Sequence, residues 1–266
     1  MESALEWHSA VALLDWQVDL GADEAIGETP VDRFAVAADA EKNPVQKPGA
    51  KLGKAPNQPV QRKEIDTVEV ARYLAQEAKT LEELRNAISG FDHCTLKRGA
   101  KSLVFADGNP SARVLILSEA PDRDEDREGR PFVGRTGKLL DRMLAAIDLD
   151  RSAKTPEQAV YITNVLPWRP PQNRDPEAEE IAMMLPFVQK HIELVDPDFI
   201  VLMGNIACRA ALGRQGILRL RGTWTEAFGK PALPMAHPSN IRQPHAKRDA
   251  WADLLSLKAR LGSEQG

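Results

Sequence analysis

Short apolar runs alternate with longer amphipathic segments from about residue 66 to the end of the chain. The runs are rich in Val, Ile and Leu, which is typical of strands buried on both faces. The longer segments repeat apolar residues at a helical spacing, and one further helix begins at a capping box, Thr80–Glu83. We expect strands at 113–118, 160–163, 199–203 and 232–235, and helices at 80–89, 138–147, 177–195, 205–212 and 245–261.

The alternation of strands and helices predicts the fold class. It indicates an α/β protein, a three-layer α/β/α sandwich around a central, mainly parallel four-stranded sheet. Before it, residues 3–21 have the pattern of an amphipathic helix, and residues 35–63 are rich in Ala, Lys, Gln and Pro. We therefore divide the chain into a helical appendage at 1–32, a flexible linker at 33–65 and a compact domain at 66–266. The appendage either docks or binds a protein partner through residues 3–21.

Composition narrows the class of protein. The chain has 266 residues, 42% hydrophobic and 28% charged, with a formal net charge of −4. No apolar run has the roughly 20 residues of a membrane span, and acids stand where a secretory signal carries Lys or Arg. These features predict a cytoplasmic protein without membrane contact. Locally, residues 213–248 contain seven basic side chains and one acid, Glu226. That segment suits either contact with a polyanion or a solvated surface.

Polar side chains follow three of the predicted strands. Glu119 and other acids come after the first, Asn164 ends the second and His237 follows the fourth, while Phe132 lies in the first loop. Because the carboxyl ends of parallel strands share one edge of a sheet, these groups can meet around one planar, polar ligand. Each also has an ordinary interpretation. The acids suit a solvated turn or a Mg²⁺ site, Phe132 suits the core, Asn164 a cap, and His237 a structural position.

Three ordered motifs carry a family resemblance. SEAPDRDED-x2-GRPFVG-x-TG-x-LL at 118–140 resembles G-E-A-P-G-x-x-E-D-x-x-G-R-P-F-V-G-x-A-G-x-L-L. Tyr161–Asn164, followed by R-P-P-x-N-R at 169–174, resembles a second motif of the same family, and H-P-S-N-I-R at 237–242 resembles its H-P-S loop. From about Cys94 to Leu261 the chain resembles the uracil-DNA glycosylase superfamily, in particular its family-four group.

The resemblance implies a monofunctional enzyme that flips uracil out of DNA and hydrolyses its N-glycosidic bond during base excision repair. Phe132 would stack on the base, and Asn164 would read the uracil edge, whose donor and acceptor pattern is the reverse of that of cytosine. His237 would donate a hydrogen bond to O2 of the leaving uracil. Ala120, through its backbone, and Ser239 would complete the substrate-binding group. No Lys is placed by a motif as a Schiff-base nucleophile, so strand cleavage is not expected.

The catalytic carboxylate is expected in the first motif. A carboxylate near the sugar would stabilise the developing cation and orient the attacking water. Glu119 matches the motif glutamate and ranks first, and Glu125 ranks second. Asp122 stands where the family has Gly, so it is a third candidate and leaves the base specificity open. The alternatives are a glycosylase for hypoxanthine, xanthine or an oxidised pyrimidine, a non-catalytic DNA-binding relative, and hydrolysis of a free nucleotide, which the basic segment disfavours.

The H-P-S loop and the residues near it are expected to contact DNA. Ile241 would enter the gap that the flipped base leaves, and Arg242 would bind a phosphate. Ile241 could equally pack under its own loop. The predicted DNA contacts are Ile241, Arg242, Arg221, Lys247 and Arg248, and the predicted partner is uracil-containing DNA, bound by a monomer.

The family's iron–sulfur ligands are mostly replaced. Family four usually holds a [4Fe–4S] cluster on four cysteines. Cys94 stands at one of these positions, while Phe91, Trp168 and Met184 stand at the other three. One thiolate of four does not hold the cluster. We therefore expect no cofactor and no metal, and a small hydrophobic plug, made of Phe91, Trp168 and Met184, in the volume of the cluster.

Overall fold

The computed structural model describes residues 66–263. The predicted helix at 3–21 and linker at 33–65 lie outside the described residues. One mixed sheet runs through the domain in the order β1-β3-β2-β4-β6-β5. Its four inner strands are parallel, and the two edge strands are antiparallel to their neighbours. The strands are β1 (Ala106–Gly108), β2 (Val114–Ser118), β3 (Val160–Asn164), β4 (Phe199–Met203), β5 (Thr225–Ala227) and β6 (Lys230–Met235).

The predicted fold class is confirmed, with a correction to the number of strands. The four expected strands are the four parallel ones. The predicted four-stranded sheet has two strands too few, because β1 and β5 add an antiparallel strand at each edge. Each has three residues and only partial burial, apart from Ala227. Such segments carry too few positions for a hydrophobic pattern to indicate a strand.

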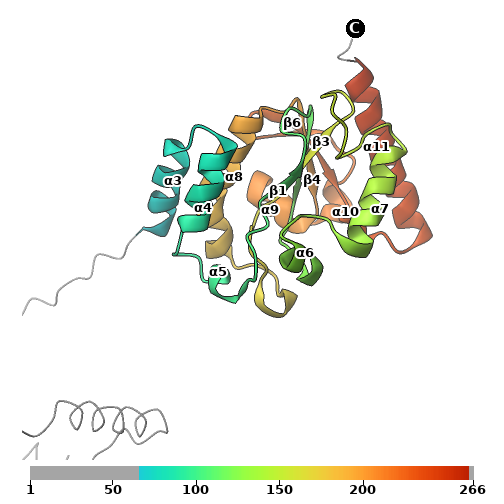
Figure 1. The fold of residues 1–266 in the computed structure, drawn as a ribbon. Helices are drawn as coiled ribbons and strands as arrows, with labels where there is room; N and C mark the ends of the chain where they lie inside the picture. Colours follow the sequence, from blue (N-terminus) through green and yellow to red (C-terminus); the bar gives the residue numbers. More distant parts are fainter. Residues whose placement is uncertain (1–65, 264–266) are drawn as a thin grey trace, which may run out of the picture. The chain divides into compact units, whose positions relative to one another are not determined.

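The helices are more numerous than the periodicity predicts. All five expected helices are present. The helix expected at 138–147 begins four residues earlier, and the helix expected at 245–261 extends further in both directions. Those not predicted are α3 (Thr67–Glu77), α5 (Leu96–Gly99), α6 (Arg123–Glu128) and α10 (Ile217–Leu220). Figure 1 shows α3 (Thr67–Glu77), α4 (Leu81–Gly90), α5 (Leu96–Gly99), α6 (Arg123–Glu128), α7 (Gly134–Ala145), α8 (Ala178–Val195), α9 (Asn205–Leu212), α10 (Ile217–Leu220) and α11 (Pro244–Ser263); the short 3₁₀ turns are η1 (Pro171–Asn173) and η2 (Pro238–Asn240).

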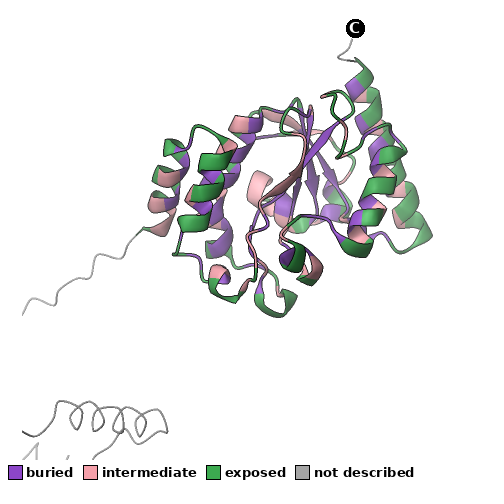
Figure 2. Cartoon of the chain, viewed as in Figure 1, coloured by how far each residue is buried: buried purple, intermediate pink, exposed green. Residues whose placement is uncertain are grey.

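Two hydrophobic cores lie on opposite faces of the sheet. Leu115 and Leu117 of β2 face the core under α3, α4, α8 and α9, whereas Val114 and Ile116 face the core under α7 and α11. The alternation follows from the strand geometry, in which successive side chains point to opposite faces. In Figure 2, β2, β3 and β4 are buried along their whole length, and the helices expose their outer sides. The three-layer arrangement is therefore the one expected from the sequence.

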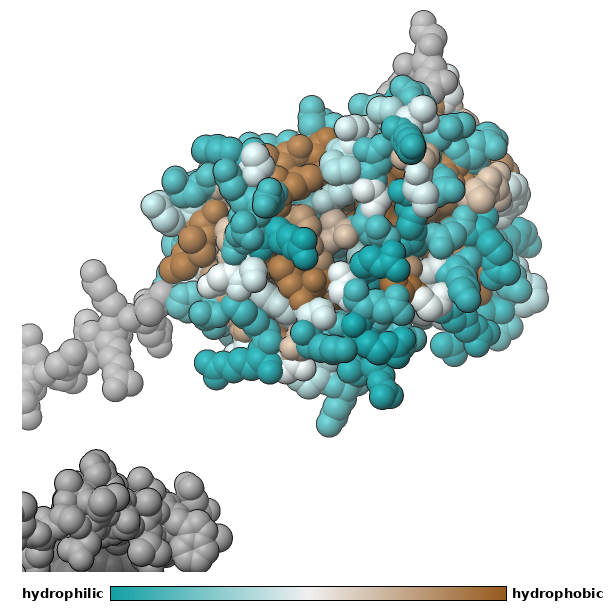
Figure 3. All heavy atoms as spheres, viewed as in Figure 1, coloured by the Kyte–Doolittle hydropathy of each residue, from teal (hydrophilic) through white to brown (hydrophobic). Residues whose placement is uncertain are grey.

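The strand register places the functional loops together. Ser118 at the end of β2 pairs with Asn164 at the end of β3, and Met203 of β4 pairs with Met235 of β6. The loops that follow these four residues therefore leave the same edge of the sheet. The face viewed in Figure 3 is mostly hydrophilic, with hydrophobic atoms between the polar side chains. Between residues 66 and 263, no helix combines the length and the hydrophobicity that a membrane crossing requires.

Candidate active site

Asn164 presents an unsatisfied hydrogen-bond donor at the end of β3. The residue is 7% exposed, and its Nδ2 atom is buried without a hydrogen-bond partner among the described residues. An unsatisfied buried polar group costs about 1–3 kcal/mol and is rare in native proteins. The side chain is therefore suited to an acceptor that a ligand supplies.

Phe132 is held in an unusual backbone conformation by Glu125. Its φ is 50°, a left-handed value that is uncommon outside Gly. The N–H of Phe132 donates to Oε1 of Glu125, and the N–H of Asp122 donates to Oε2 at 2.7 Å. Burial raises the pKa of Glu125 to about 7, and these two amide donors oppose that rise. Both oxygens of Glu125 are thus engaged in fixing the loop that carries the ring.

A close backbone approach also fixes the Phe132 loop. A Cβ added at Gly137, in the first turns of α7, would lie 1.8 Å from the carbonyl oxygen of Phe132. Only Gly fits there, because the two backbones are already in contact. The loop between α6 and α7 therefore has little freedom to move the Phe132 ring.

His237 lies against the Phe132 ring. The ring centroids are 5.3 Å apart and the planes are 26° from parallel. Nδ1 of His237 accepts the backbone N–H of Ser239 at 3.3 Å and lies 2.7 Å from its Oγ. Burial lowers the pKa of His237 to about 4, and the nearby charge of Asp122 opposes this slightly. The imidazole is therefore neutral at pH 7, and with Nδ1 accepting the amide, Nε2 carries the proton.

Glu119 lies at the amino end of α9. Its Oε1 accepts the backbone N–H of Ile206 at 3.1 Å, and burial raises the pKa of the carboxyl group. Gly204, with φ of 102°, gives the carboxylate room, since an added Cβ would lie 2.3 Å from Oε1. Glu119 lines a cavity of about 460 Å³ together with Asn240 of the H-P-S loop. The carboxylate and that loop therefore share one cavity.

The first loop contributes two further predicted residues. Oδ1 of Asp122 accepts the amides of Asp124 and Glu125 and caps α6. Asp122 therefore has a structural task in addition to any catalytic one. Within 66–263, the N–H of Ala120 has no hydrogen-bond acceptor, and its contact with a substrate stays a prediction.

The comparisons with known proteins decide the family. Residues 105–255, more than half of the chain, match the Uracil DNA glycosylase superfamily. The chain belongs to this superfamily. It is 34% identical over 197 residues to a type-4 uracil-DNA glycosylase of Archaeoglobus fulgidus, covering 70% of this chain and 96% of that protein. It is 33% identical over 177 residues to the type-4 enzyme of Thermotoga maritima, covering 64% and 89%. It is 36% identical over 149 residues to that of Sulfurisphaera tokodaii, covering 54% and 65%.

The DNA contacts expected of this uracil-DNA glycosylase superfamily member fall into two groups. Arg242, Lys247 and Arg248 are exposed, although Arg248 lies 3.7 Å from Asp249. Arg242 also donates from Nε to the carbonyl of Ser239 at 3.0 Å, which ties it to the H-P-S loop. These three cations are available to a phosphate backbone.

The other two expected DNA contacts are placed differently. Ile241 is only 6% exposed and packs against Ala236 and Ala250. This is the alternative arrangement under its own loop, and the side chain is not presented as a wedge. The guanidinium of Arg221 is bound by the buried carboxylate of Asp253. Arg221, which directly follows α10, thus links the end of that helix to α11 in this structure instead of presenting a free charge.

The iron–sulfur position is filled by side chains that do not fit a cluster. The plug residues Phe91, Trp168 and Met184 are, like Cys94, at most 3% exposed, and all four belong to one core. The Phe91 ring packs edge to face on Phe187 with centroids 5.4 Å apart. No group of three or more potential metal ligands exists within the described part of the chain. A single thiol among two aromatic rings and a thioether cannot supply the four thiolates that a cluster requires.

Arg151 supports the site, although the sequence did not indicate it. Arg151 donates from Nη1 to Asp107 at 3.0 Å and to the carbonyl of Pro131 at 3.2 Å. It also contacts Asp141. It therefore links β1, α7 and the residue directly before Phe132. Because these partners are distant in sequence, neither periodicity nor a motif could have indicated the contact.

Proposed function

We propose that the protein hydrolyses the N-glycosidic bond between uracil and deoxyribose in DNA and leaves an abasic site. The proposal rests on the Nδ2 atom of Asn164, which is buried and has no hydrogen-bond partner among the described residues. In the proposed complex Nδ2 donates to O4 of uracil, and Oδ1 accepts its N3–H. Cytosine would place a donor against Nδ2 and an acceptor against Oδ1, which leaves buried groups unpaired. The names of the relatives support the same base.

His237 would stabilise the leaving group. Its neutral state and its Nδ1 acceptor role leave Nε2–H as a donor beside Phe132. As the bond to the sugar breaks, negative charge develops on O2 of uracil. A fixed donor aimed at such a charge contributes about 3–4 kcal/mol. The contact between the two rings supports placing the base next to both.

Glu119 would act on the water and the sugar. The water oxygen bonds to C1′ while the C1′–N1 bond breaks, and the electron pair stays on uracil. Glu119 accepts the proton of the water and stabilises the cationic sugar, and solvent later protonates the uracil anion. Glu125 is the weaker candidate for this step because both of its oxygens bind backbone amides. We assign it the positioning of Phe132.

Phosphate contacts and base choice complete the proposal. Arg242, Lys247 and Arg248 would bind the DNA backbone, because they are exposed and lie near the H-P-S loop. The cap that Asp122 makes on α6 explains its presence without a change of substrate. For that reason uracil is preferred over hypoxanthine or xanthine.

A uracil-containing oligonucleotide tests the proposal. The protein is incubated with single-stranded and duplex forms, and alkali then cleaves any abasic site. We expect cleavage with the wild type, and loss of cleavage with Asn164→Ala. Asn86→Ala, an exposed amide on α4, is the matched control and should retain activity. An intact strand with folded wild-type protein, under conditions in which another uracil-DNA glycosylase cuts, would overturn the assignment.

A further inference from the structure

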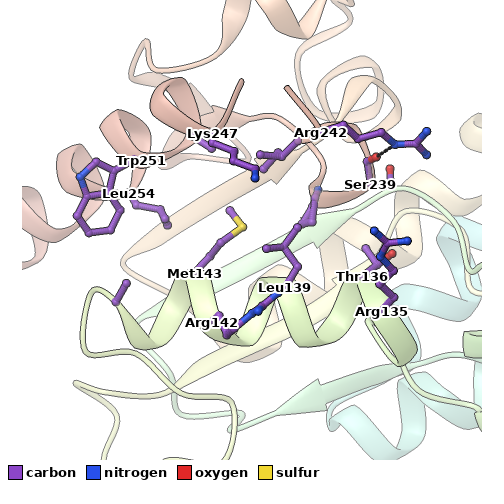
Figure 4. A pocket seen from close by; sticks show the side chains of 14 residues that line it. Arg135, Thr136, Leu139, Arg142, Met143, Ser239, Arg242, Lys247, Trp251 and Leu254 are labelled. Carbon is purple, nitrogen blue, oxygen red and sulfur yellow. Dashed lines mark hydrogen bonds between the residues drawn. The ribbon is translucent and has the colours of Figure 1, made fainter. Parts of the chain in front are cut away.

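A second cavity lies beside the active site, between α7 and α11. It is a groove of about 840 Å³, separate from the cavity that Glu119 lines. Leu139 and Met143 of α7 and Leu254 of α11 give it an apolar floor, and the H-P-S loop closes one end through Ser239. Figure 4 shows Ser239 at one end of the groove and Trp251 at the other. The groove is therefore continuous with the loop that holds His237.

The walls of the groove are cationic. Arg135 and Arg142 stand on α7, and Arg242 and Lys247 stand on the opposite wall, while the lining contains no acid. Within 66–263, Arg135, Arg142 and Lys247 have no carboxylate partner. Elsewhere on α11, Lys258 is paired with Asp148 at 2.6 Å. Like charges that face one cavity without counter-charges favour an anion with several negative groups.

An aromatic ring lies at the end of the groove opposite Ser239. Trp251 is 43% exposed and lines the groove. Exposed aromatic rings beside cationic side chains are the usual platform for an unstacked base. Phosphate alone would use the cations and leave the ring without a role. A paired base would keep its faces within the duplex, so the ring suits a single strand.

We propose that the groove between α7 and α11 binds single-stranded DNA next to the flipped nucleotide, with phosphates on Arg135, Arg142 and Lys247 and a base on Trp251. The choice of DNA rests on the proposed function, while the class of ligand follows from the charges and the ring. The strand passes from the H-P-S loop along the groove toward the middle of α11. The enzyme therefore holds more of the substrate than the base it excises.

Binding of a uracil-free, fluorescently labelled single strand tests the ring. Because stacking on an aromatic side chain is worth about 1–3 kcal/mol, Trp251→Ala should weaken binding by about 5- to 150-fold. Leu255→Ala is the matched control, since Leu255 is 45% exposed on the same helix and does not line the groove. Equal affinities of the two variants would overturn the stacking contact. An equally large loss on blunt duplex DNA would overturn the preference for a single strand.

The dependence of affinity on salt tests the charges. Each phosphate contact to a single strand contributes about 0.7 to the slope of log affinity against log salt. Arg142→Gln should reduce that slope by about this amount. Lys154→Gln removes one exposed charge from the loop before β3, at the amino ends of the parallel strands. This variant should leave the slope unchanged. The same slope in both variants would overturn the phosphate contact.

These measurements are independent of base release. If the variants behave as expected but the wild type releases no uracil, the groove stands and the proposed function fails. If uracil is released while Trp251→Ala and Arg142→Gln bind like their controls, the function stands and the groove proposal fails.

Discussion

The proposed active site and the plug are built in opposite ways, although both lie at positions of the family's motifs. At the active site Asn164 keeps a buried donor without a partner, and His237 keeps a free N–H beside an aromatic ring. In the plug, Phe91, Trp168 and Met184 are buried among apolar neighbours. The first region has a buried polar group that no described residue satisfies, and the second packs apolar side chains together.

The difference separates what binds substrate from what supports the fold. An unpaired buried donor destabilises the free protein by about 1–3 kcal/mol, so its retention indicates a ligand. A large apolar side chain stabilises by about 1.5–3 kcal/mol when it is fully buried. In this protein the plug is stabilised by apolar packing, whereas the donor of Asn164 has no partner among the described residues. Substitutions in each region test this difference between the proposed active site and the plug.

The largest effect is expected from emptying the plug. Phe91→Ala should lower the free energy of unfolding by about 3–5 kcal/mol, because it leaves a cavity in the core. Urea unfolding of the wild type and of Phe91→Ala measures this difference in unfolding free energy. Tyr73→Ala, at a side chain that is 64% exposed on α3, is the control and should change stability by about 0.5 kcal/mol or less. Uracil release at low temperature should survive in both, and its loss in the folded Phe91→Ala protein would show that the two regions are coupled.

The next effect is expected at the active site and in activity alone. His237→Gln should reduce the single-turnover rate of uracil release by about 10²–10³-fold, since a fixed donor to the leaving group is lost. The unfolding free energy, measured in parallel, should remain close to that of the wild type. Because the pKa of His237 is lowered to about 4, this imidazole should contribute no step to the rate near pH 6.5. The pKa of Glu125 is raised to about 7, and its titration can give a step of its own. A step near pH 6.5 that remains in Glu125→Gln would mean that the imidazole works as a cation.

A smaller effect is expected from a buried histidine whose partner, Tyr161, lies in the same core as the plug. His191 of α8 bonds the hydroxyl of Tyr161 at 2.8 Å, and full burial lowers its pKa to about 3. The unfolded chain takes up a proton near pH 6.5 that the folded chain does not, so stability falls as pH falls below 6.5. His191→Gln should remove a slope that rises from about 0.7 kcal/mol per pH unit at pH 6.5 to about 1.4 kcal/mol per pH unit near pH 5. Urea unfolding at several pH values measures it.

The raised pKa of Glu125 acts in the opposite direction. Its pKa of about 7 means that the folded chain binds a proton more readily than the unfolded chain between pH 4.5 and 7. Its contribution is common to the wild type and His191→Gln, so it cancels in the difference between them. An unchanged slope in His191→Gln would contradict the neutral, buried state of His191.

The smallest effect is expected from the support of the catalytic imidazole. Ser239→Ala removes the Oγ that lies 2.7 Å from Nδ1 of His237 and keeps the backbone N–H that also reaches it. A single hydrogen bond of this kind contributes about 0.5–1.5 kcal/mol. Uracil release should therefore slow by up to about 10-fold, without a change in unfolding. A loss as large as that of His237→Gln would make Ser239 a direct participant.

The parts of the fold that could be predicted are those with a local signal. The inner strands are continuous apolar runs, and the long helices have a regular apolar spacing. The helix α6 has neither, because its residues RDEDRE are all polar and its start depends on the Asp122 cap. The short edge strands exist only because β3 and β6 are beside them.

The site shows the same division. The motifs indicate Phe132, Asn164, Glu119 and His237 as candidates, and the position of their loops at the carboxyl ends of the strands follows from the parallel topology. Contacts between distant positions could not be foreseen. Arg221 has the charge and place of a DNA contact in the sequence, but Asp253, 32 residues further on, occupies it. The cationic groove requires α7 and α11 to pack together, which no pattern within either helix indicates.

The two antiparallel edge strands have a consequence for behaviour at high concentration. A long, flat strand at the margin of a sheet invites a strand of another molecule to pair with it. Here β1 and β5 have three residues each, β1 ends at Gly108 with φ of 103°, and β5 turns into β6 through Phe228 and Gly229, both with positive φ. Neither margin offers a template long enough for such pairing. The domain is thereby protected against intermolecular β-aggregation.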